Sequence, residues 1–229
     1  MSLLFLVLIM CFIIFLFSLY LLARDDFVIV RRDISLDDIF NAAFLTGLIT
    51  LLSARVFFVI FHPSANYLNP LVFLLFPYFP GLSSLGGIVG GVTFLIFYAK
   101  RHKMPIGRIL DFFAVSFLVS VVPAYLGFFL IERSIEGVFI IELILFIILT
   151  IVTLFIFPRL YKLNVKDGSS ALSIFIMTFL IFFIGKIVLV IKTKQFLFTP
   201  ENILLAALII LFSGLLIKRE IIVRLLKAR

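Results

Sequence analysis

The chain has 229 residues, of which 64% are hydrophobic and only 14% are charged, and its mean hydropathy is +1.34. Several apolar runs are long enough to cross a hydrocarbon layer about 30 Å thick as helices, and they lack the alternating pattern of a membrane barrel strand. This composition excludes a water-soluble fold. It predicts an all-α, polytopic integral membrane protein that forms a single transmembrane helical domain over residues 1–229.

Seven membrane spans are predicted from the apolar runs and the polar residues between them. In chain order they cover residues 3–22, 39–61, 82–99, 109–131, 138–157, 171–191 and 202–217, of which the last is the shortest. The segment 68–80 is also apolar, but it contains Pro70, Pro77 and Pro80. Because proline interrupts helices, we expect this segment to lie at the interface or to re-enter the membrane.

The one cysteine, Cys11, lies inside the first apolar run, so it has no partner for an internal disulfide. We expect it to be a small buried hydrophobic residue. The run around it has no basic residue in front, which favours a retained helix over a cleaved signal peptide.

The basic residues predict the orientation of the spans. Most of the 20 Lys and Arg residues fall in the first, third and fifth loops and in the basic tail 218–229. The other loops hold only Arg133, Lys192 and Lys194. Since cytoplasmic loops collect basic residues, the N-terminus is predicted outside and the C-terminus in the cytoplasm. The net charge of +8 is therefore assigned to orientation and to anionic lipid headgroups, with no nucleic-acid partner.

Ionisable residues inside spans are costly, so each is a candidate for function. Arg55 in the second span could snorkel outward or point into a cavity. Asp111 stands near the start of the fourth span, close to Arg108, where a helix-start charge or a local ion pair would explain it.

Glu142 and Lys186 lie at similar depth in the outer halves of the fifth and sixth spans. They could form a structural ion pair, since a buried charge needs a partner. The alternative is a polar cavity in which a cationic side chain meets a lipid phosphate, because arginine and lysine both bind phosphate.

The third span begins with glycines at two overlapping four-residue spacings, Gly86 with Gly90 and Gly87 with Gly91, and Ser83 extends this small face. Such a face lets another helix backbone approach closely. The start of a helix also offers unpaired backbone N–H groups, so a lipid headgroup is a second candidate occupant.

Two stretches, "LTGLITLLSARVFFVIFH" and "PGLSSLGGIVGGVTFLIFYAKRHKMPIGRILDFFA", together resemble prolipoprotein diacylglyceryl transferase. Members of that family show a Gly-Ala-Arg motif, a Ser-Phe-His-Gly-Gly stretch, a basic loop and a Leu-Asp start to the next span. The local similarity covers roughly residues 45–115. Beyond it the similarity is one of topology, since the family has seven spans with the N-terminus outside.

The resemblance implies an enzyme of the bacterial cytoplasmic membrane. Such an enzyme moves a diacylglyceryl group from phosphatidylglycerol to the lipobox cysteine in the signal peptide of a preprolipoprotein, without a metal or cofactor. The chemistry requires a base or field that forms the thiolate, cations that hold the leaving glycerol phosphate, and a lateral opening for two membrane substrates.

The resemblance also implies site residues. It assigns substrate binding to Arg55, Ser84, Gly86, Gly87 and Lys186, and catalysis to Glu142, Tyr125 and Lys186. Asp111 matches the aspartate that opens the fourth span in the family.

The sequence departs from the family pattern at Lys186, which stands in the place of an arginine, and at three further positions. Leu85 stands where the family has a histidine, Tyr125 where it has an arginine, and Phe128 where it has an asparagine. Two functions therefore remain open: an active transferase in which Tyr125 and Lys186 compensate, or a non-catalytic relative that binds phospholipid or lipoprotein.

Overall fold

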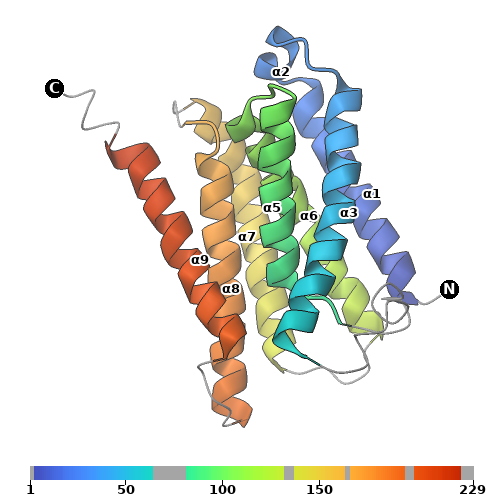
Figure 1. The fold of residues 1–229 in the computed structure, drawn as a ribbon, viewed down its shortest axis with the longest axis vertical. Coiled ribbons are helices and arrows are strands. Elements are labelled where there is room, and N and C mark those ends of the chain that lie inside the picture. The colour runs from blue at the N-terminus through green and yellow to red at the C-terminus, as the bar shows by residue number, and fades with distance from the viewer. Residues whose placement is uncertain (1–2, 64–80, 132–136, 163–165, 194–198, 223–229) are drawn as a thin grey trace. The chain divides into compact units, whose positions relative to one another are not determined.

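The computed structural model describes residues 3–63, 81–131, 137–162, 166–193 and 199–222, and all structural statements concern these residues. Their regular elements are all helical, and none of these residues lies in a strand (Figure 1). The elements are α1 (Leu3–Arg24), α2 (Phe27–Arg31), α3 (Leu36–Phe61), α5 (Ser84–Arg101), α6 (Ile106–Ile131), α7 (Gly137–Lys162), α8 (Ser169–Thr193), α9 (Pro200–Ile217) and a π-helical turn, η2 (Lys218–Ile222).

A helix stands at each of the seven predicted spans, which confirms the all-α, multi-pass membrane protein. Six of the described helices are long and apolar enough to cross a membrane: α1, α3, α6, α7, α8 and α9. The seventh, α5, has 18 residues, including four glycines near its start and Lys100 and Arg101 in its last turn, which lower its hydropathy. The count of seven spans and their orientation stay predictions. The segment 68–80 lies outside the described residues.

The short helix α2 was not expected from the sequence. It begins after Asp26, whose side chain accepts hydrogen bonds from the backbone N–H groups of Val28 and Ile29 at 3.0 and 3.1 Å. An N-cap of this kind satisfies donors that a helix start leaves unpaired. The cap therefore explains a helix too short to show any hydrophobic period.

The helices pack as two compact groups. Group one contains Met1–Leu6 and Tyr20–Ile106, and so includes α2, α3 and α5. Group two contains Val7–Leu19 and Gly107–Arg229, and so includes nearly all of α6 together with α7, α8, α9 and η2. The prediction of one domain over the whole chain stays a prediction.

In group one, α3 and α5 lie side by side and antiparallel (Figure 1). A methyl group added at Gly86 would lie 2.7 Å from Cγ of Phe57, and one at Gly90 would collide with the Ser53 side chain. The backbone N–H of Ser83 donates to the carbonyl of Ala54 at 3.0 Å. The prediction that the glycine face admits another helix is confirmed, and that helix is α3.

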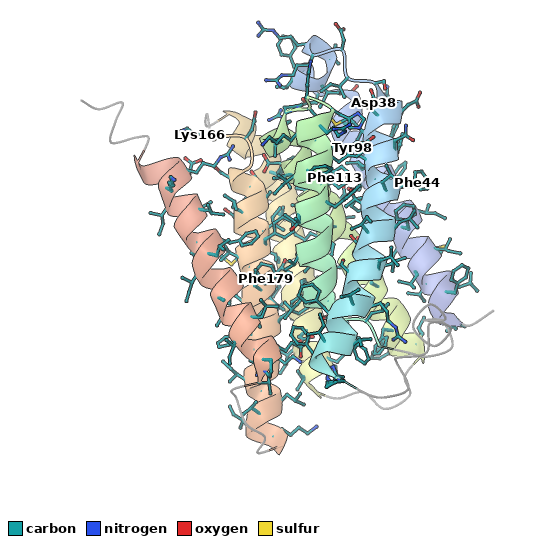
Figure 2. The ribbon with its side chains drawn as sticks, viewed as in Figure 1. Asp38, Phe44, Tyr98, Phe113, Lys166 and Phe179 are labelled. Carbon is teal, nitrogen blue, oxygen red and sulfur yellow. The ribbon has the colours of Figure 1, made fainter. Side chains whose placement is uncertain are left out.

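In group two, aromatic side chains fill the space between helices. Phe179 on α8 (Figure 2) is fully buried and meets the ring of Phe212 on α9 at 5.5 Å, edge to face. Phe146 on α7 is also fully buried and meets Phe182 on α8 at 5.6 Å. These contacts hold α7, α8 and α9 together, and edge-to-face geometry adds to the packing of the rings.

Candidate functional site

Arg55 on α3 is buried, with only 2% of its surface exposed. Its Nη1 donates a hydrogen bond of 2.8 Å to the carbonyl oxygen of Gly81, and its guanidinium lies 5.8 Å from the centre of the Phe58 ring. Gly81 has a φ of +142°, which suits glycine, and it lies three residues before the start of α5. The burial and the bond to Gly81 argue against snorkelling, and a cavity at Arg55 stays a prediction. Arg55 links the last turns of α3 to the entry into α5.

The glycine pair at the start of α5 is used for packing and capping. The Ser83 hydroxyl accepts a hydrogen bond from the Gly86 N–H at 3.2 Å, and the Gly87 N–H donates to the Ser83 carbonyl at 3.0 Å. Both glycines and Leu85 are buried, whereas Ser84 is exposed. Among Ser84, Gly86 and Gly87, which the resemblance assigns to substrate binding, Ser84 is the accessible residue. Direct headgroup contact by Gly86 and Gly87 stays a prediction.

Tyr125 and Glu142 are joined in group two. The Tyr125 hydroxyl donates to Oε2 of Glu142 at 2.8 Å, which links α6 to α7. The Tyr125 ring stacks on Phe139 at 4.9 Å and meets Phe146 at 5.2 Å. The carboxylate thus receives a polar partner within an aromatic surrounding. Two of the residues assigned to catalysis are in direct contact.

Lys186 pairs with a residue that sequence reasoning missed. Its Nζ lies 2.8 Å from Oε2 of Glu201, at the start of α9, with side-chain exposures of 38% and 21%. The structural alternative of a Glu142–Lys186 pair is therefore wrong, because Lys186 is paired with Glu201 and Glu142 with Tyr125. We call Tyr125, Glu142, Lys186 and Glu201 the α6–α9 cluster.

A sequence signal for Glu201 exists. Thr199 and Pro200 precede it, and the Thr199 hydroxyl accepts a hydrogen bond from the Asn202 N–H, so the run reads as a helix start with an acid in its first turn. The helix end that carries Glu201 follows the end of α8 that carries Lys186. This places the acid near the lysine.

Asp111 serves a structural purpose. Its carboxylate accepts hydrogen bonds from the backbone N–H groups of Gly168 at 2.6 Å and Ala171 at 2.7 Å, and it is 3% exposed. These groups belong to the start of α8, so Asp111 caps a helix other than its own. Arg108, the expected local partner, forms an ion pair with Asp167 at 3.2 Å.

The first residues of the predicted basic tail bind within the protein. The Arg219 guanidinium donates to the carbonyl of Asp167, and the Ser169 hydroxyl donates to Glu220. Lys166 (Figure 2) donates from its Nζ to the Arg219 carbonyl at 3.3 Å. The η2 turn is thereby fastened to the start of α8. Part of the tail charge is therefore used within the fold, and its attraction to anionic lipid stays a prediction.

The α6–α9 cluster combines a carboxylate that can accept a proton, a phenol that can donate a hydrogen bond and an ammonium that can hold an anion. Arg55 and Ser84 belong to group one and the cluster to group two. Within the described ranges, no three His, Cys, Asp or Glu side chains are grouped as metal ligands would be.

One family model matches most of the helical region. The family model of prolipoprotein diacylglyceryl transferase matches residues 5–215, which reaches from α1 to α9. The match extends far beyond the stretch of local resemblance at 45–115. No curated protein matches the chain. The chain belongs to the prolipoprotein diacylglyceryl transferase family.

Proposed function

We propose that the chain transfers a diacylglyceryl group from phosphatidylglycerol to the lipobox cysteine of preprolipoproteins in the bacterial cytoplasmic membrane. One observation carries the proposal: in a chain of this family, the Tyr125–Glu142 hydrogen bond lies in the same helical group as the Lys186–Glu201 ion pair. Ionisable groups inside membrane helices cost free energy, and a transferase acting on membrane substrates requires a base and a cation at this depth.

In the proposed reaction, Glu142 accepts the proton of the lipobox thiol. The thiolate attacks the diacylglyceryl carbon that carries the phosphate, so a carbon–sulfur bond forms while the carbon–oxygen bond to the phosphate breaks. Glycerol phosphate leaves with the electron pair of that bond. Lys186 exchanges Glu201 for this phosphate, and Tyr125 donates to the phosphate once Glu142 has taken the proton.

Arg55 and Ser84 are proposed to bind the donor headgroup. Two observations support this role: Arg55 is a buried cation that reaches the segment before α5, and Ser84 is exposed in the first turn of that helix. Gly86 and Gly87 contribute by letting the start of α5 approach α3 closely.

The test uses purified protein in nanodiscs that contain phosphatidylglycerol, together with a lipobox peptide whose cysteine is read by mass spectrometry. We expect one diacylglyceryl adduct, none on a peptide with serine in place of cysteine, and roughly 100-fold or more slower formation with Glu142→Gln or Arg55→Ala. An unchanged rate in Glu142→Gln would remove the proposed base.

A second candidate is a relative that binds phospholipid or lipoprotein without turnover. Two observations favour it: Leu85, in place of the family histidine, is buried with 4% exposure, and Tyr125, in place of an arginine, is bonded to Glu142. This candidate predicts saturable phosphatidylglycerol binding with no adduct. An active family member assayed in the same nanodiscs separates the two candidates.

A further inference from the structure

Gly185 lies inside α8, one residue before Lys186, directly against the side chain of Glu142. A methyl group added at Gly185 would collide with Oε1 of Glu142 and would lie 2.7 Å from its Cδ and 3.1 Å from its Cγ. The three nearest atoms all belong to that one side chain. The Glu142 carboxylate therefore occupies the space that a side chain at position 185 would need.

The two oxygens of Glu142 have different neighbours. Oε1 lies against the α8 backbone at Gly185, while Oε2 accepts the hydrogen bond from Tyr125 on α6. The carboxylate is thus confined from two sides, by the α8 backbone and by the Tyr125 hydroxyl. Glycine is also a poor residue for a helix interior, so a reason for it here has to come from what lies against it.

We propose that Gly185 is a positioning residue: by leaving out a side chain it lets the Glu142 carboxylate lie against α8 and holds it at the Tyr125 hydroxyl. The inference rests on the proposed function only for its effect on the reaction, since the position of the carboxylate is itself a property of the fold. A residue with a side chain at this position pushes the carboxylate away from Tyr125.

The contact at Gly185 differs from an ordinary helix–helix contact through a small residue. A glycine that serves only to bring α7 and α8 together would meet the backbone of α7 or several of its side chains. At Gly185 the obstacle is Glu142 alone among the nearest atoms. Removing the Glu142 side chain should therefore make an alanine at this position harmless.

The first test is a double-mutant cycle on thermal stability in detergent. Gly185→Ala is expected to lower Tm by roughly 3 to 10 °C in the otherwise native chain, as overpacking does in a protein of this size. In the Glu142→Ala background the same change is expected to leave Tm unchanged or to raise it. The control is Gly214→Ala in α9, where an added methyl group meets nothing within 4 Å. Equal losses in both backgrounds would overturn the proposal.

The second test measures the Tyr125–Glu142 hydrogen bond by infrared spectroscopy. Infrared spectra of protein with isotope-labelled tyrosine report the Tyr125 hydroxyl, whose band is assigned by its loss in Tyr125→Phe. We expect Gly185→Ala to shift this band as Glu142→Ala does, and Gly214→Ala to leave it unchanged. A band that stays in place in Gly185→Ala contradicts the proposal, even if the variant has lost stability.

The third test is the transfer assay. Displacement of a reacting group by about 1 Å can cost roughly 100-fold in rate, and we expect a loss of that order in Gly185→Ala. In the Glu142→Gln background, Gly185→Ala should add little further loss. Absence of any transfer by the native chain would count against the proposed function, whereas the stability cycle and the infrared band would still decide the role of Gly185.

Discussion

The Tyr125 hydroxyl donates a 2.8 Å hydrogen bond to the Glu142 carboxylate, and this bond joins α6 to α7 within group two. Tyr125→Phe removes the donor while keeping the ring that packs on Phe139 and Phe146. We expect the free energy of unfolding to fall by about 1 to 3 kcal/mol, because a partly buried carboxylate loses its partner. Unfolding in mixed micelles measures this.

The control for Tyr125→Phe is Tyr20→Phe in α1. The Tyr20 ring stacks on Phe40, and its hydroxyl makes no hydrogen bond among the described residues. Equal stability changes in the two variants would show that the Tyr125–Glu142 bond contributes nothing measurable.

Asp111→Ala is expected to destabilise the protein because two buried N–H groups at the start of α8 lose their acceptor. The loss should be about 2 kcal/mol or more, and Asp111→Asn should lose less because its amide keeps one acceptor oxygen. Asp37→Ala is the control: this acid is exposed in the first turn of α3, where about 0.3 to 1 kcal/mol is at stake. Equal effects of Asp111→Ala and Asp37→Ala would contradict the capping role.

Gly86→Ala is expected to separate α3 from α5, since the added methyl group would collide with Phe57 and would lie 3.0 Å from the carbonyl of Ser53. Overpacking of this kind costs roughly 1 to 3 kcal/mol, and a backbone atom cannot move aside as a side chain can. A disulfide probe between α3 and α5, or unfolding in mixed micelles, measures the change. Gly214→Ala supplies the comparison, and matching values for the two variants would argue against close packing here.

Lys186 and Glu201 are expected to affect transfer in opposite ways. Lys186→Ala removes the cation proposed to hold the leaving phosphate, so we expect a rate loss of roughly 100-fold or more. Glu201→Gln removes the competitor for that cation and should leave the rate unchanged or raise it. Lys192→Ala, at an exposed position in the last turn of α8, controls for the loss of a positive charge. A full rate in Lys186→Ala would remove Lys186 from the phosphate site.

The long helices could be predicted from the sequence because each follows an apolar run of membrane length. Their ends differ by a few residues where caps decide them: α9 begins at Pro200 because Thr199 caps it, two residues before the predicted start. The helix α2 could not be predicted from periodicity, since it has five residues and depends on the Asp26 cap.

The charged candidates were predictable, but their partners were not. Arg55, Asp111, Glu142 and Lys186 stand out in the sequence because membrane spans rarely hold charges. Their contacts depend on how helices are rotated against one another, which depth along a span does not reveal. Depth alone suggested Glu142 for Lys186, whereas the rotation of α8 turns Gly185 toward Glu142 and lets Lys186 reach Glu201.

The most direct test of the proposed transfer follows both products of one reaction. Nanodiscs are prepared with phosphatidylglycerol labelled in its headgroup glycerol, and the lipobox peptide adduct and released glycerol phosphate are measured together by mass spectrometry. We expect equal amounts of thioether adduct and labelled glycerol phosphate, both lost with Glu142→Gln. Neither product from this chain, alongside both products from an active family member in the same nanodiscs, would contradict it.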